Sequence, residues 1–155
     1  MNISEAKQYI DLFGNGTGEH TPLAILVPNF EVKTELREYL EKIHGAKRIN
    51  ILLVSGASQY FDAKGNLVSD ISQRQQRLAD GTTFNAAEYL EARVKEYDNS
   101  EFKFLYDIAD VPTPDMLGVS RYIAQKTGKR LVVIAPIPEK GQDILFYPFD
   151  TVVVN

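Results

Sequence analysis

Four short apolar runs, separated by segments with helical patterns, constrain the fold of this chain more than any other feature. The runs are rich in leucine and β-branched residues and cover positions 23–27, 49–55, 102–108 and 131–137. Continuous apolar character of this kind is typical of strands that are buried on both faces of a sheet. Strands that alternate with helices along a chain favour a parallel sheet with right-handed crossovers.

We therefore predict an α/β fold of three layers, with helices on both faces of a mostly parallel sheet. The chain has 155 residues, which is the size of one ordinary domain, so we expect a single domain over residues 1–155. A sheet of about four to six strands is usual for such a domain.

Four segments carry the start and stop signals of helices. They cover residues 4–13, 30–44, 85–97 and 114–127, with predicted caps at Ser4, Asn29, Asn85 and Thr113 and predicted glycine ends at Gly14, Gly45 and Gly128. A more polar helical turn is predicted over residues 71–79.

Two antiparallel additions to the sheet are predicted. The first is a hairpin over residues 59–68, with Gly65 in its loop. The second is a C-terminal hairpin at the sheet edge, in which residues 144–147 turn back against residues 132–137. Prolines at 136, 138 and 148 favour an edge position because proline cannot donate to a strand ladder. Residues 151–154 are predicted to form one more strand.

Composition excludes several classes of function. The chain has no cysteine and only two histidines, His20 and His44, so we predict no metal site. Its formal net charge is −4, without the basic footprint that duplex nucleic acid requires. It shows neither a secretory signal nor an apolar run of the ~20 residues that a membrane helix needs. We therefore expect a cytoplasmic protein with no membrane partner.

Motifs for common chemistries are incomplete. The glycines of residues 14–18 follow a helix, whereas a dinucleotide fingerprint follows a strand, and no phosphate-binding P-loop sequence is present. The turn at residues 55–58 lacks the flanking glycines of a hydrolase elbow. Glu101-Phe102-Lys103 has nuclease-like spacing but lacks an aspartate on a neighbouring strand. We accordingly predict no cofactor.

The best candidate site comes from topology. Ligands of open parallel sheets bind beyond the carboxyl ends of the strands, at the point where the chain reverses its winding direction. The side chains and backbone predicted to lie there are those of Asn29, Ser55, Gly56, Asp107, Asp110 and Thr113. Paired carboxylates at Asp107 and Asp110 can divide acid and base work or hold a cation. The favoured alternative is structural, with Asp110 at the start of a loop and Asp107 bonding backbone amides at the end of the strand.

Two stretches resemble the nucleoside 2-deoxyribosyltransferases. Val27-Pro28-Asn29-Phe30 follows the first predicted strand, and Asp115-Met116-Leu117-Gly118 leads through a helix into the run at residues 131–134. That family binds nucleosides at strand ends of a small α/β domain and uses a glutamate nucleophile on the corresponding late helix. Here residues 119–121 are valine, serine and arginine where the glutamate is expected, so we do not assign the chain to that family.

Two functions remain open from the sequence. The first is a non-catalytic binding module of the immunity, inhibitor or accessory type, whose partner is another protein. Aromatic anchors for such a partner are predicted at Tyr60, Phe61, Tyr147 and Phe149, with ordinary core packing as the alternative for each. The second is a small-molecule enzyme or sensor that binds a nucleoside or nucleotide at the strand ends. It predicts a concave, partly apolar pocket that holds carboxylates with altered pKa values. The binding module predicts no pocket of that kind, and instead an exposed aromatic patch or an unpaired sheet edge.

Overall fold

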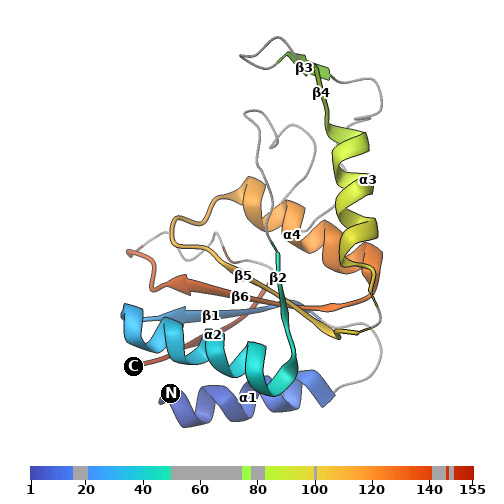
Figure 1. The fold of residues 1–155 in the computed structure, drawn as a ribbon. Coiled ribbons are helices and arrows are strands. Elements are labelled where there is room, and N and C mark those ends of the chain that lie inside the picture. Colours follow the sequence, from blue (N-terminus) through green and yellow to red (C-terminus); the bar gives the residue numbers. More distant parts are fainter. Residues whose placement is uncertain (16–20, 50–74, 78–82, 100, 141–145, 147–148) are drawn as a thin grey trace.

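The computed structural model describes residues 1–15, 21–49, 75–77, 83–99, 101–140, 146 and 149–155. These residues form a five-stranded, wholly parallel sheet with helices packed against it, which confirms the predicted α/β architecture (Figure 1). The strand order is β2-β5-β6-β1-β7. The strands are β1 (Leu23–Val27), β2 (Lys47–Arg48), β5 (Phe104–Ile108), β6 (Arg130–Pro136) and β7 (Asp150–Val153).

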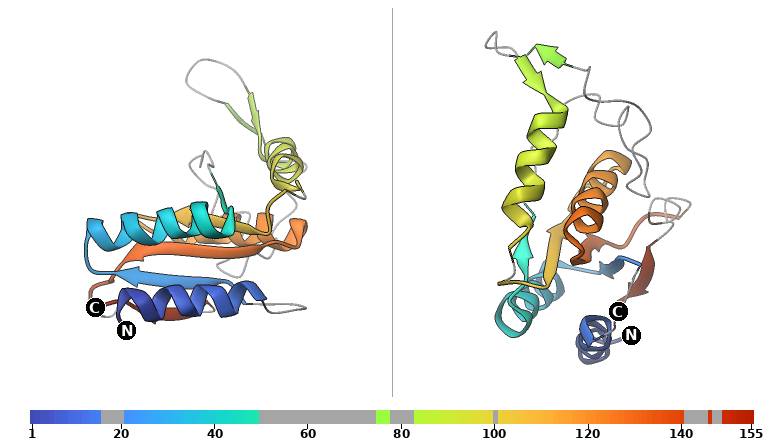
Figure 2. Two further views of the ribbon diagram at one scale, coloured as in Figure 1. Left: turned by 60° about the horizontal axis from the view of Figure 1, so that its bottom comes forward. Right: turned by 90° about the vertical axis from the view of Figure 1, so that its right-hand side faces the viewer.

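Helices cover both faces of the sheet. The helices are α1 (Ile3–Asn15), α2 (Phe30–His44), α3 (Ala86–Tyr97) and α4 (Pro114–Thr127). The right-hand view of Figure 2 shows α1 and α2 below the sheet and α3 and α4 above it. The chain therefore has the three layers that the alternating pattern predicted.

Each face of the sheet contributes to its own apolar core. In β1, Ile25 packs with α1 and α2, whereas its neighbour Leu26 packs on the side of α3 and α4. Successive strand residues point to opposite faces, and both faces are covered, so both sets of side chains must be apolar. This explains why β1, β5 and β6 read as nearly continuous apolar runs, whereas the edge strand β2 is Lys47–Arg48 and is exposed.

Helices α2 and α4 begin and end at the predicted residues. The Asn29 Oδ1 atom accepts the Val32 N–H at 3.0 Å, and the Thr113 Oγ1 atom accepts the Met116 N–H at 3.2 Å. Gly45 and Gly128 close these helices in the left-handed conformation, with φ of 59° and 68°. Because α2 follows β1 directly, its cap holds the first helical turn at the carboxyl end of the sheet.

The ends of α1 differ from the prediction. Its cap is Asn2 and not Ser4, since Asn2 Oδ1 accepts the Glu5 N–H and the Glu5 carboxylate accepts the Asn2 N–H, at 2.8 and 3.1 Å. Gly14 lies inside the helix instead of ending it. A methyl group at Gly14 would lie 2.7 Å from the Phe104 ring, so close packing, and not a left-handed turn, explains this glycine.

The polar helical turn predicted over residues 71–79 is wrong where the structure describes it. Residues 75–77 form β3 (Gln75–Arg77), which pairs antiparallel with β4 (Thr83–Asn85) in a separate two-stranded sheet. Residues 75–77 are glutamine, glutamine and arginine, with no apolar side chain to bury against a helix, so strand pairing satisfies their backbone better than an isolated turn would. The predicted hairpin over residues 59–68 lies outside the described residues.

The described residues do not show the predicted antiparallel C-terminal edge hairpin, since all five strands of the main sheet are parallel. Strand β7 forms that edge and lies parallel to β1, with Leu23 opposite Asp150. Strand β6 lies inside the sheet, where Pro136 is tolerated because it is the last strand residue. Of residues 144–147, the structure describes only Phe146, which is buried in the core beneath α3 and α4. No helix within the described ranges is long and apolar enough to cross a membrane.

Candidate functional site

The carboxyl ends of β1, β6 and β5 form a point where the chain winds in opposite directions. From β1 the chain passes through α2 on one face to β2, and from β5 it passes through α4 on the other face to β6. Strand β6 lies between β1 and β5, so the loops that leave its two neighbours separate above and below it (Figure 1). Such a switch point is where open α/β sheets bind ligands.

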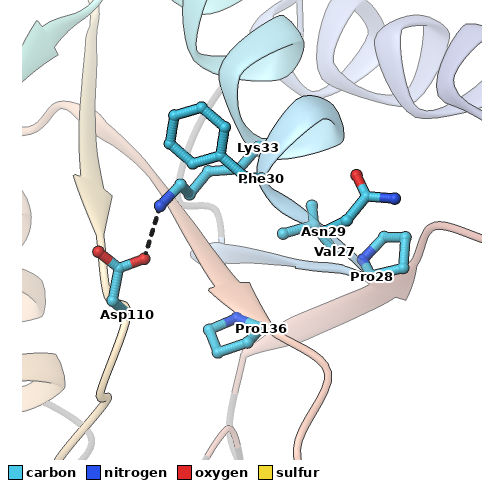
Figure 3. A pocket seen from close by; sticks show the side chains of 7 residues that line it. All are labelled: Val27, Pro28, Asn29, Phe30, Lys33, Asp110 and Pro136. Carbon is cyan, nitrogen blue, oxygen red and sulfur yellow. Dashed lines mark hydrogen bonds and ion pairs between the residues drawn. The ribbon is translucent and has the colours of Figure 1, made fainter.

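A pocket of about 190 Å³ lies at this switch point. Figure 3 shows its lining, which consists of Val27, Pro28, Asn29, Phe30, Lys33, Asp110 and Pro136. Its walls are mainly apolar, and its charged groups are one lysine and one aspartate. Pockets for drug-sized molecules span about 300–1,000 Å³, so this pocket suits a smaller group, on the scale of one side chain.

Lys33 and Asp110 form an ion pair in the pocket lining. The Lys33 Nζ atom lies 2.8 Å from Asp110 Oδ1 and 5.0 Å from the centre of the Phe30 ring (Figure 3). The Lys33 side chain is 21% exposed and that of Asp110 is 67% exposed. The pair thus joins the first turn of α2 to the loop between β5 and α4, which belong to opposite faces of the sheet.

Two predicted site residues serve as helix caps. Asn29 lines the pocket, but its amide oxygen is bonded to the first turn of α2, and its side chain is directed away from the ion pair (Figure 3). Thr113 does not line the pocket, and its hydroxyl caps α4.

Asp107 and Asp110 do not form a carboxylate pair in the pocket. Asp107 is buried on the side of α4, where its Oδ2 atom accepts the Ser120 hydroxyl at 3.0 Å. Burial raises the pKa of Asp107, whereas the Ser120 hydrogen bond and the Arg48 charge lower it. Asp107, whose pKa is raised, is therefore a structural group of the sheet–helix interface. Ser55 and Gly56 lie outside the described residues.

Exposed apolar side chains flank the pocket. Phe30, which lines it, is 68% exposed, and Val111 and Ile137, which follow the lining residues Asp110 and Pro136 in the chain, are 76% and 45% exposed. The Ile137 N–H donates to Val27 O at 3.2 Å, which holds the chain after β6 beside the end of β1. Among the predicted aromatic anchors, Phe149 is buried, while Tyr60, Phe61 and Tyr147 lie outside the described residues.

The other titratable clusters join helices to their neighbours. The Asp11 carboxylate accepts the Tyr39 hydroxyl at 2.6 Å and lies 2.7 Å from His44 Nε2, so these groups connect α1 to α2. The hydrogen bond to Asp11 raises the pKa of Tyr39 to about 12. The Tyr106 hydroxyl bonds Glu41, and burial raises the pKa of Tyr106 to about 12. Within the described part of the chain, no group of three acidic or histidine side chains is arranged to hold a metal ion.

Lys33 is the charged residue of the pocket lining that sequence reasoning missed. A signal was present, because Lys33 lies four positions after the Asn29 cap and a side chain there can reach back toward the preceding strand end. Comparison of the chain with protein-family models, curated proteins and solved structures gives no match. Any function must therefore be argued from the geometry of this site.

Proposed function

We propose that the protein is a non-catalytic binding module that holds another protein at the carboxyl edge of its sheet. The observation that carries this proposal is the exposure of Phe30, Val111 and Ile137 in and beside the pocket lining. These large apolar side chains come from the ends of three neighbouring strands, β1, β5 and β6. Exposed apolar groups that gather around a hollow are a common mark of a protein interface.

The pocket has the size and shape of a receptor for one anchor residue. Its volume of about 190 Å³ lies below the range of about 300–1,000 Å³ that is usual for pockets of drug-sized ligands. Interfaces gain most of their affinity from a few side chains that fill such hollows, while the surrounding contacts exclude water. We therefore place one partner side chain in the pocket and its neighbours on Phe30, Val111 and Ile137.

The polar side chains at this edge already bond one another or the backbone, which suits binding of a partner better than catalysis. Lys33 and Asp110 bond each other, while the Asn29 and Thr113 side chains bond the first turns of α2 and α4. A general acid or base must reach a substrate proton in a pocket, but the buried Asp107 bonds Ser120 away from this one.

A nucleoside or nucleotide sensor is the second candidate. The position of the pocket at the switch point favours it, as do the paired donor and acceptor on Lys33 and Asp110 beside the Phe30 ring. The volume fits a base but not a whole nucleotide, so the protein-binding function is preferred.

Site-specific photo-crosslinking tests the proposal. A photoreactive phenylalanine analogue replaces Phe30 in one variant and Leu12 in a matched control, since Leu12 is 74% exposed but lies on α1, away from this edge. In extracts of the source cells, we expect a discrete protein adduct at position 30 that is absent at position 12 and is lost on Val111→Asp. Equal labelling at both positions, or at neither, contradicts the proposal.

A thermal-shift screen with nucleosides and nucleotides tests the second candidate, the sensor, independently of the first. A ligand that binds only the native state raises the melting temperature by mass action. A saturable shift that disappears in Asp110→Asn would support the sensor in place of the protein-binding module.

A further inference from the structure

We infer that the pocket receives the C-terminal residue of the partner protein, with its apolar side chain between the pocket walls and its carboxylate on Lys33. This inference rests on the proposed protein-binding function and names the chemistry of the partner. The observation behind this inference is an apolar hollow whose lining contains a single lysine.

The walls select an apolar side chain. Val27, Pro28, Phe30 and Pro136 supply most of the lining, and the volume of about 190 Å³ admits one aliphatic or aromatic side chain. The rings of Pro28 and Pro136 restrict their backbone. Pro136 lies opposite Val27 in the pairing of β6 with β1, and Pro28 follows Val27 directly. Because these walls are held by the sheet, the hollow is formed before a partner arrives.

The lysine of the site can bind a carboxylate in the place that Asp110 occupies. Lys33 is the cation of the pocket lining, and its ammonium group is held between the Phe30 ring and Asp110. The Asp110 carboxylate, 2.8 Å from Lys33 Nζ, shows the position that a carboxylate takes at this lysine. The N-terminal end of α2, where Lys33 lies, further favours a negative charge.

A chain terminus fits these two features better than an internal acidic residue. In a C-terminal residue the apolar side chain and the carboxylate share one Cα atom, so a hollow directly beside one cation can bind both groups. Capture of terminal carboxylates is a recurrent mode of peptide recognition. The preceding partner residues then leave the pocket across Val111 and Ile137, which are exposed beside it.

Asp110 competes with the incoming carboxylate for Lys33. Since Asp110 is 67% exposed, it can turn into solvent when the partner carboxylate arrives. Removing the Asp110 charge should therefore free Lys33 and strengthen binding of the partner carboxylate. If Asp110 instead held a basic partner, the same change would weaken binding.

The experiment uses a short fluorescein-labelled peptide of glycine and serine that ends in valine and leucine, prepared as the free acid and as the C-terminal amide. With the whole protein we expect the free acid to bind about tenfold more tightly than the amide, the scale of one charge-assisted contact. Lys33→Met should abolish the difference between acid and amide, and Asp110→Asn should tighten binding of the acid severalfold. Lys42→Met is the matched control and should change neither value, because Lys42 is 73% exposed near the other end of α2.

Each remaining outcome decides against the inference. Equal affinity for acid and amide, no binding of the acid, or weaker binding by Asp110→Asn overturns it. N-acetyl-leucine that binds as tightly as the peptide would identify a free small acid as the ligand instead of a protein terminus. If these peptide assays fail while the adduct at position 30 persists, the protein-binding function stands and only the terminal-carboxylate inference is lost.

Discussion

At the scale of single residues, Asp107 shows how a buried carboxylate makes stability depend on pH. Burial raises the pKa of Asp107 above its ordinary value of 3.8, so the folded protein binds this proton more tightly than the unfolded chain does. The contribution of Asp107 is therefore fully present below about pH 4 and is lost as the pH rises through the folded-state pKa.

Asp107→Asn removes this titration while its amide oxygen can still accept the Ser120 hydroxyl. We expect the free energy of unfolding of the variant, relative to that of the unchanged protein, to increase as the pH rises from about 4 to 7. Urea unfolding between about pH 4 and pH 7 measures it, with the exposed Asp98→Asn as control. A difference that does not vary with pH would show that Asp107 does not titrate in this range.

Gly14 is the second residue whose role depends on one contact. A methyl group there would lie 2.7 and 2.8 Å from two atoms of the buried Phe104 ring. Overpacking of this kind costs roughly 1–3 kcal/mol, against about 1 kcal/mol gained when alanine replaces a helical glycine. We expect Gly14→Ala to lose about 1 kcal/mol of unfolding free energy.

A double-mutant cycle with Phe104→Leu tests that cause. In the Phe104→Leu background the ring is gone, so Gly14→Ala should be neutral or stabilising, and the two changes should not be additive. The same loss in both backgrounds would mean that the Phe104 ring is not what requires glycine at this position.

At the scale of elements, Asn29 both lines the pocket and caps α2, so its structural role can be measured apart from binding. The side chain caps α2, so Asn29→Ala should lower the free energy of unfolding by about 1 kcal/mol. Asn29→Ser keeps a capping oxygen and should lose only a few tenths of a kcal/mol. Urea unfolding of both variants measures the cap, and an equal loss in the two would contradict it.

The elements that could be predicted from the sequence are those with local signals. Helices α2 and α4 have caps and glycine ends within the same stretch of chain, and the apolar runs of β1, β5 and β6 follow from burial on both faces. The pairings of β3 with β4 and of β7 with β1 join distant or polar segments, so no local pattern indicates their direction. Glycine inside α1 likewise reflects contact with Phe104, about ninety positions away.

At the scale of the whole molecule, the position of the pocket could be predicted but its lining could not. The alternation of strands and helices places a site at the carboxyl edge, and the structure places a pocket there. Capping residues cluster at the same edge because helices begin where strands end, so sequence reasoning cannot separate Asn29 as a cap from Asn29 as a ligand. Lys33 and Asp110 are 77 positions apart, and only the folded sheet shows that they meet.

The carboxyl edge lies apart from the two apolar cores, so changes at the edge should have little effect on the free energy of unfolding. The cores lie between the sheet and its helices, whereas the Lys33–Asp110 pair spans the mouth of a surface pocket. Partly exposed ion pairs contribute about 0–1 kcal/mol, so Lys33→Met and Asp110→Asn should each change the free energy of unfolding by less than about 1 kcal/mol. Leu105→Ala, which empties part of a core, should cost about 2–5 kcal/mol in the same urea experiment.

Opposite effects of the two edge variants on peptide binding then report on the site itself, because neither variant has disturbed the fold. Raising the salt concentration should weaken binding of the free-acid peptide and leave binding of the amide nearly unchanged, since salt screens the contact between Lys33 and a carboxylate. A large loss of stability in Lys33→Met would instead make the ion pair a structural bond between the two faces of the sheet. In that case the pocket would be a by-product of the way the faces are joined, and the tighter binding expected for Asp110→Asn would not be observed.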